Sequence, residues 1–223
     1  MPIKRTLLVS LIIFILLTAC NQKTSPTQAA QPTQEPAQPV SPTAAPSGKE
    51  YVPINACDHP YYPHAEGSWW ETSDGTIYAV IDSQGDNIKA SATVSNTASD
   101  GKVTLLHYNC ENGRLDLVAT GDVDEAGNEI NLRSIAESTG GKCESLTMLP
   151  SMVDIMNQQS WKQCEATCRV TTTLQLITQF GTFDAIRVDC DNGTAKYFAY
   201  GMGLVKNCTI NGCLEVTAYT LPY

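Results

Sequence analysis

The chain has little that would support acid–base catalysis. Its 223 residues include only three histidines, His59, His64 and His107. The serine-nucleophile elbow G-x-S-x-G, the zinc helix H-E-x-x-H and the phosphate loop G-x-x-x-x-G-K-[ST] are all absent from the sequence, as is a C-x-x-C redox pair. We therefore expect no catalytic residue, no cofactor and no metal.

Positive charge is also scarce. The chain carries 14 Lys and Arg against 23 Asp and Glu, a net charge of −9. Without Lys4 and Arg5, which belong to the leader described below, 12 basic residues face 23 acidic ones, a net charge of −11. Nucleic acid and anionic membrane surfaces are bound by clusters of basic side chains, so this balance argues against both as direct partners of the domain.

A single long apolar run occurs, and it is too short to span a bilayer. Residues 7–17 are apolar except for Ser10, about half of the ~20 residues that a membrane-spanning helix needs. Lys4 and Arg5 precede the run, and the small residues Thr18 and Ala19 follow it. This order predicts an export signal peptide at residues 1–19.

The cysteine at the end of the leader makes the number of cysteines in the chain odd. Nine cysteines are present, and Cys20 stands in the segment "LTAC", which resembles the lipobox of bacterial lipoproteins. The resemblance implies cleavage before Cys20 and acyl chains on that residue, where several chains give a stable anchor at about 0.8 kcal/mol per buried methylene. The protein would then be attached to the cell membrane or outer membrane of a bacterium, with its domain facing the periplasm or the exterior. The alternative is an ordinary secretory signal with an incidental cysteine.

Composition changes after the leader and again near residue 50. Residues 20–49 contain six prolines with many Gln, Thr, Ala and Ser, and they lack the apolar content needed to fold. We expect a disordered tether that reaches on the order of 90 Å at about 3.1 Å per residue. Residues 50–223 remain as one domain with enough chain to form a core.

Turn signals divide this domain into short strands. Pairs such as Asp74-Gly75, Asn112-Gly113 and Asn192-Gly193 separate β-prone runs, among them "TIYAVIDS", "KVTLLHYNC" and "TFDAIRVDC". The pattern predicts an all-β domain with one short helix, formed by a single curved antiparallel sheet. The helix is expected in "SMVDIMNQQSW", residues 151–161, with Ser151 as its N-cap. Gly201 and Gly203 indicate a bulge or a close backbone approach.

The domain contains eight cysteines, an even number, in a compartment that permits disulfides. They are Cys57, Cys110, Cys143, Cys164, Cys168, Cys190, Cys208 and Cys213. We therefore expect up to four bridges, and the one pairing that the sequence suggests locally is Cys208 with Cys213 across a hairpin loop. The alternative is zinc, since Cys164-x-x-x-Cys168 and Cys208-x-x-x-x-Cys213 resemble half-sites and Cys57 lies near His59 and His64.

Four aromatic residues cluster at the start of the domain, in "YYPHAEGSWW". Tyr61, Tyr62, Trp69 and Trp70 form a possible ligand face, because exposed rings can stack on flat ligands. Their alternative role is in the core or as cover for a sheet edge.

The C-terminal third resembles a group of uncharacterised bacterial lipoproteins. The segments "FGTFDAIRVDC" and "YFAYGMGLVK" are similar to a GTFDAxRV…YxAxGxGLVK signature, and "YYPHAEGSWWE" resembles the entry segment of the same group. These proteins are similar to the curved half-barrels of lipoprotein and lipid carriers such as LolA and LppX. The resemblance implies a half-barrel with one apolar concave face, and it identifies no catalytic residue.

These observations favour a lipid-anchored envelope lipoprotein that is not an enzyme and that binds an unknown envelope ligand or protein, or serves as a structural module. A first alternative is a carrier that holds lipid or a lipoprotein against the concave apolar face. A second is an envelope hydrolase, for which His107 is the candidate, although its strand position favours a partly buried structural histidine.

Overall fold

Thirteen β-strands and two short helices make up residues 51–222, the part of the chain that the computed structural model describes. The elements are β1 (Trp69–Thr72), β2 (Ile77–Gly85), β3 (Lys89–Thr97), β4 (Val103–Glu111), β5 (Arg114–Val123), β6 (Glu129–Ser134), α1 (Ile135–Ser138), β7 (Leu146–Leu149), α2 (Met152–Met156), β8 (Ser160–Gln163), β9 (Ala166–Thr178), β10 (Gly181–Cys190), β11 (Ala195–Ala199), β12 (Gly203–Thr209) and β13 (Gly212–Thr220). The expected signal peptide (1–19), Cys20 and the tether (20–49) lie outside the described residues.

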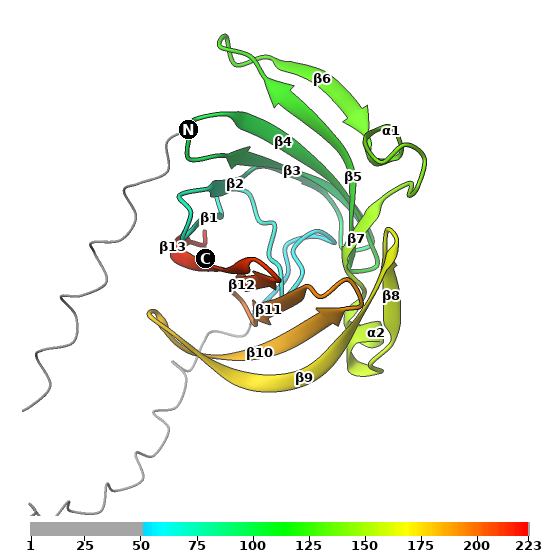
Figure 1. Ribbon diagram of the computed structural model, residues 1–223, viewed down its shortest axis with the longest axis vertical. Helices are drawn as coiled ribbons and strands as arrows, with labels where there is room; N and C mark the ends of the chain where they lie inside the picture. Colours follow the sequence, from blue (N-terminus) through cyan, green and yellow to red (C-terminus); the bar gives the residue numbers. More distant parts are fainter. Residues whose placement is uncertain (1–50, 223) are drawn as a thin grey trace, which may run out of the picture. The chain divides into compact units, whose positions relative to one another are not determined.

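Twelve of the strands form a closed antiparallel barrel (Figure 1). The order is β4-β3-β2-β1-β13-β12-β11-β10-β9-β8-β7-β5, and β5 pairs with β4 to complete the ring. Strand β6 pairs with β5 outside the ring. Closure removes the exposed sheet edges that an open sheet would present to other chains.

The closed barrel confirms the all-β class and corrects the expected half-barrel. Turn signals report only which neighbouring strands pair, as in the β4–β5 hairpin, where Asn112 and Gly113 both have positive φ (51° and 76°). Closure depends instead on β1 pairing with β13, through contacts such as Trp69 with Thr220. These residues stand near opposite ends of the domain sequence, so no local pattern encodes their contact.

The segment before β1, residues 51–68, runs through the centre of the ring in Figure 1. Cys57 and His64 are almost fully buried in it, at 0% and 1% exposure. A disulfide joins Cys57 to Cys110 of β4, and on the opposite side the Gly201 N–H donates to the carbonyl of Pro60. The segment therefore fills part of the barrel and connects opposite walls.

Apolar side chains cover both faces of the wall around β10. Ala185 belongs to the larger hydrophobic cluster, which includes Trp70 and Tyr108, whereas Ile186 belongs to a second cluster with Phe198. Successive residues of a strand point to opposite faces. The wall around β10 is therefore packed on both sides.

Both helices begin with side-chain caps. Ser151 accepts a hydrogen bond from the Asp154 N–H and starts α2, which confirms the expected cap, although the helix ends at Met156 and residues 160–163 form β8. Helix α1 was missed, because residues 129–138 alternate like a strand. There Ser134 and Glu137 form a capping box that ends β6 and starts the helix.

All eight domain cysteines form disulfides, which bears out the expectation of a disulfide-stabilised domain. The pairs are Cys57–Cys110, Cys143–Cys164, Cys168–Cys190 and Cys208–Cys213, the last as assigned from the sequence. Cys164 and Cys168 therefore belong to different bridges. Four disulfides indicate that the domain folds in an oxidising compartment outside the cytoplasm.

Gly201 lies in the tight turn between β11 and β12, and Gly203 is the first residue of β12; their φ angles are +70° and +104°. The expected close approach is present at Gly203, where a Cβ would lie 3.4–3.5 Å from atoms of Tyr62, Pro63 and Trp70. A register shift occurs nearby in the β11–β12 pair, between Tyr197 and Phe198 of β11. Within residues 51–222, no helix is both long and apolar enough to cross a membrane.

Candidate functional site

The main candidate site is a cavity of about 350 Å³ inside the barrel, open to solvent on one side. Most of its lining is apolar or aromatic and comes from strands all round the ring. The lining residues include Trp70, Tyr78, Leu106, Tyr108, Leu117, Leu146, Met148, Leu204, Leu214 and Val216. Its volume falls within the range of about 300–1,000 Å³ typical of small-molecule sites, and its apolar lining is typical of them.

Three polar residues lie together on one part of this lining. Lys196 of β11 and Asn207 of β12 are directly opposed across the two strands, so their side chains share the face that lines the cavity. Gln163, at the end of β8, accepts a hydrogen bond from Lys196 Nζ to its Oε1 at 2.9 Å. We call Gln163, Lys196 and Asn207 the polar cluster.

The polar cluster leaves hydrogen-bonding capacity unused. An ammonium group has three N–H donors, and within residues 51–222 Lys196 Nζ makes one hydrogen bond, to Gln163. The side-chain oxygen of Asn207 is buried and has no hydrogen-bond partner among the described residues. A buried acceptor without a partner costs about 1–3 kcal/mol, so this oxygen favours any donor that reaches it.

Charge in the cavity is concentrated on Lys196. Among residues 51–222, no carboxylate oxygen lies within 4.0 Å of Lys196 Nζ. Burial lowers the pKa of Lys196 from 10.5 to about 8, because desolvation disfavours the ammonium form. Lys206, which also borders the cavity, forms an ion pair with Glu215 and is thereby compensated.

The cavity tyrosines are neutral at physiological pH. Burial raises the pKa of Tyr62 and of Tyr108 well above 10, and it raises the pKa of Tyr78 as well. They contribute ring surface and hydroxyl groups, and no charge that would compensate Lys196.

The four aromatic residues proposed as a ligand face do not share one face. Tyr62 and Trp70 line the cavity, and Trp70 is 4% exposed. Trp69, adjacent to Trp70 in β1, points to the opposite side of the wall and is half-buried. Tyr61 packs edge-on against Tyr200, with ring centroids 5.6 Å apart.

The histidines lie apart from the polar cluster. His107 contacts Glu129 of β6 at 2.6 Å through Nε2 and is partly exposed. His59 and His64 are buried in the central segment, and burial lowers the pKa of each to about 4. His107 Nδ1 lies 3.4 Å from the Thr93 hydroxyl, so both ring nitrogens have partners, as the structural interpretation expected.

Sequence reasoning missed the polar cluster. A weak signal exists in "TAKYFAY", where Lys196 stands two positions before the apolar Phe198 and is expected on the same side of the strand. A lysine on the apolar side of a strand is unusual, because lysine is almost never fully buried unless paired. Gln163 and Asn207 carry no comparable signal, because only the fold brings them to Lys196.

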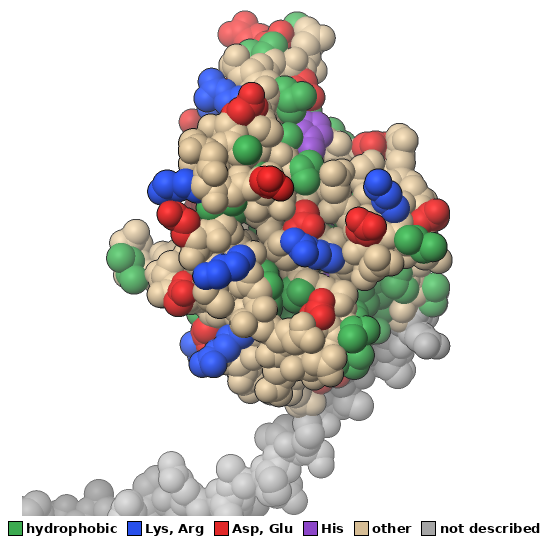
Figure 2. Space-filling view, turned by 90° about the vertical axis from the view of Figure 1, so that its right-hand side faces the viewer, with side chains coloured by type: hydrophobic (Ala, Val, Ile, Leu, Met, Phe, Trp, Pro, Cys, Tyr) green, Lys and Arg blue, Asp and Glu red, His purple; other side chains and the backbone are tan. Residues whose placement is uncertain are grey.

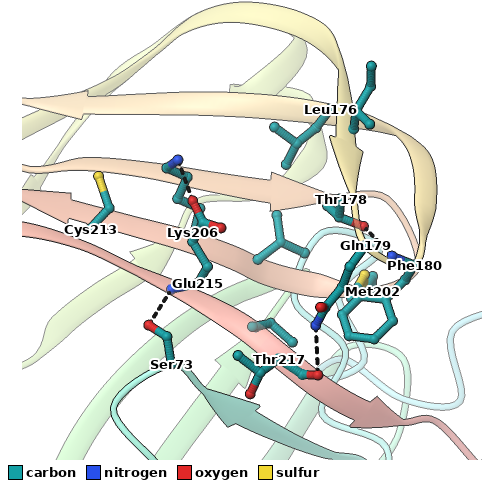
Figure 3. A pocket seen from close by; sticks show the side chains of 13 residues that line it. Ser73, Leu176, Thr178, Gln179, Phe180, Met202, Lys206, Cys213, Glu215 and Thr217 are labelled. Atoms are coloured by element: carbon teal, nitrogen blue, oxygen red, sulfur yellow. Dashed lines mark hydrogen bonds and ion pairs between the residues drawn. The ribbon is translucent and has the colours of Figure 1, made fainter.

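A second pocket, of about 280 Å³, adjoins the cavity along β12 and β13 and shares Val205, Lys206 and Val216 with it. Figure 3 shows the tip of the β9–β10 hairpin beside this pocket, with Gln179 donating to the Thr217 carbonyl at 2.8 Å. Phe180 packs edge-on against Tyr219. The hairpin tip is thus held against β13, which it does not neighbour in the sheet.

The outer surface carries charges of both signs. On the face of the domain in Figure 2, acidic and basic side chains are interspersed, and apolar side chains are scattered between them. This face offers no continuous charged patch for a partner.

Comparisons with known proteins give only distant likenesses. No family model matches the chain, and no curated protein matches it. An exported protein with a YmcC-like fold from Bacteroides fragilis is 12% identical, with a TM-score of 0.42 over 73% of this chain and 100% of that chain. A lipoprotein from Parabacteroides distasonis is 13% identical, with a TM-score of 0.38 over 73% and 99%. At these values neither structure establishes a function for this chain.

Proposed function

We propose that this protein is a non-catalytic, lipid-anchored binding module of the bacterial cell envelope that holds an apolar small molecule inside its barrel. The observation that carries the proposal is the cavity of about 350 Å³, lined mainly by apolar and aromatic side chains. Burying apolar ligand surface there would be favourable by about 25 cal/mol per Å². Of the functions considered from the sequence, this is closest to the carrier.

The lipid anchor is supported by "LTAC" at residues 17–20, and the four disulfides support export. The anchor is tested on protein purified from membranes of a lipoprotein-processing host. We expect the mature chain to begin at Cys20 and to carry acyl chains, seen as added mass on its N-terminal peptide. An N-terminus other than Cys20 would contradict the anchor and leave the cavity proposal standing.

Binding is tested on residues 21–223, exported behind an ordinary secretory leader and purified without detergent. Native and denatured masses are compared, and an organic extract of the same protein is analysed for small molecules. We expect either added native mass that is lost on denaturation or, if the cavity is empty after purification, saturable binding of decanol. A bare protein that binds no apolar probe would contradict the proposal.

A cavity-filling variant is compared with a matched surface variant. Met148→Trp places a larger side chain in the lining, whereas Val153→Trp adds the same side chain on the exposed surface of α2. We expect the first to reduce binding at least tenfold and the second to leave it unchanged. Equal binding by both variants would place the ligand elsewhere.

A further inference from the structure

We propose that the cavity selects an amphiphile with one anionic head group, whose carboxylate binds Lys196 and whose neighbouring N–H or O–H donates to Asn207. This inference rests on the proposed function and adds the chemical class of the ligand. N-acyl amino acids and hydroxy fatty acids are two compounds of this class.

The head-group preference follows from the unpaired charge. Lys196 is the uncompensated cation of the cavity, because Lys206 is paired with Glu215 and the tyrosines are neutral. A carboxylate that enters beside Lys196 Nζ can accept its two remaining N–H donors. Charge-assisted hydrogen bonds of this kind are shorter and about twice as strong as neutral ones.

The second requirement follows from Asn207. Its unpartnered side-chain oxygen lies beside Lys196 across the β11–β12 pair, so the two groups present a donor and an acceptor side by side. A fatty acid anion without such a donor supplies the carboxylate for Lys196 and nothing for Asn207. A ligand with an amide N–H or a hydroxyl next to its carboxylate satisfies both.

Size and lining restrict the rest of the ligand. A cavity of about 350 Å³ suits one chain of moderate length and not the several chains of a membrane phospholipid. Leu106 of β4 and Leu117 of β5 lie across the ring from Lys196 and Asn207, and they offer apolar contact for that chain. The apolar and polar parts of the lining therefore match the two ends of an amphiphile.

The first test compares probes of equal chain length on the unmodified exported chain, residues 21–223. Decanoate, decanol and decyltrimethylammonium are titrated by calorimetry at pH 7. We expect decanoate to bind about ten- to a hundredfold more tightly than decanol, as a charged hydrogen bond implies, and the cationic probe to bind most weakly. Equal affinity for decanoate and decanol would overturn the head-group inference while leaving the proposed function intact. Binding of none of the probes would overturn both.

The second test assigns the preference to residues. Lys196→Met keeps the length of the side chain and removes its charge, and Lys162→Met makes the same change on the outer surface. We expect the first variant to lose the preference for decanoate and keep its affinity for decanol, and the second to behave as the unmodified chain. A preference that persists in Lys196→Met would contradict the role of this lysine.

The third test addresses Asn207. N-decanoylglycine adds an amide N–H beside its carboxylate, so we expect it to bind about tenfold more tightly than decanoate. Asn207→Leu should remove this advantage and leave the preference for decanoate over decanol. Melting temperatures verify that each variant folds, and the probe comparison on the unmodified chain remains decisive if a variant does not. An unchanged advantage in Asn207→Leu would overturn the role of Asn207.

Discussion

The indole Nε1 of Trp70 donates a hydrogen bond of 2.8 Å to the main-chain carbonyl of Met202. It joins β1, the first strand of the barrel, to the turn between β11 and β12. Both residues are almost fully buried, so water cannot replace the bond. The same tryptophan lines the cavity inside the barrel, so the hydrogen bond couples the stability of the turn to the shape of the cavity.

Replacing this donor should destabilise the barrel. Trp70→Phe keeps an aromatic ring but leaves the Met202 carbonyl without its partner, and we expect the free energy of unfolding in urea to fall by about 1–3 kcal/mol. Trp69→Phe, on the other side of the same strand, is the control and should cost less. Equal losses for the two variants would show that the hydrogen bond is not the cause.

Gly203 should tolerate no side chain. Its φ of +104° disfavours L-residues, and an added Cβ would lie 3.4–3.5 Å from Tyr62, Pro63 and Trp70. Gly127→Ala shares a positive φ of +84° but adds its Cβ in open space. We expect Gly203→Ala to lower the melting temperature more than Gly127→Ala does, because only the former adds crowding to strain. The same melting temperature for both would mean that the neighbours of Gly203 move aside.

Removal of the Cys57–Cys110 bridge should cost more than removal of Cys208–Cys213. The bridged cysteines are separated by 53 and 5 residues respectively. Loop-closure entropy then gives contributions of about 4 and about 2 kcal/mol. The paired substitutions Cys57→Ala/Cys110→Ala and Cys208→Ala/Cys213→Ala are compared by chemical denaturation. The reverse order would show that local packing outweighs loop length.

The lowered pKa of Lys196 predicts how stability depends on pH. Between about 8, its pKa in the fold, and 10.5, its ordinary value, the unfolded chain binds more protons than the folded one. Stability relative to Lys196→Met should therefore rise with pH across this window, by up to about 3 kcal/mol. The variant retains Tyr62, Tyr78, Tyr108 and Lys206, so their titration cancels in the difference. A flat difference between pH 8 and 10.5 would contradict the burial of a charged lysine.

Acid should destabilise the domain through the two buried histidines of the segment 51–68. The pKa values of His59 and His64 are lowered from 6.5 to about 4, so between these values the unfolded chain binds more protons. Stability should fall as the pH falls from 6.5 to 4. His64→Gln removes one of these titrations, and we expect a smaller loss over the same range. A loss in His64→Gln as large as that of the unmodified chain would contradict this role of His64.

Much of the strand pattern can be predicted from the sequence, because turn pairs and alternation act over a few residues. The β4–β5 hairpin at Asn112-Gly113 and the Cys208–Cys213 bridge across the β12–β13 hairpin are examples. Closure of the ring through Trp69 and Thr220 depends on contacts between distant residues and was not predictable in this way.

The site was less predictable than the strands. Tyr61, Tyr62, Trp69 and Trp70 were expected as one possible ligand face, but only Tyr62 and Trp70 of the four line the interior cavity. Gln163 precedes Lys196 by 33 positions in the chain, and Asn207 follows Lys196 by 11. Their significance lies in missing partners, which a sequence does not display.

The bond between Cys57 and Cys110 also determines how the domain bears mechanical load. Cys57 precedes β1 along the chain and is bonded to β4, so tension applied from the N-terminal side passes through a covalent link into β4 before it reaches β1. Strand β4 is in turn held by long pairings with β3 and β5. A pull on this end is thus distributed over three paired strands, and β1, only four residues long, is shielded from being peeled off the barrel.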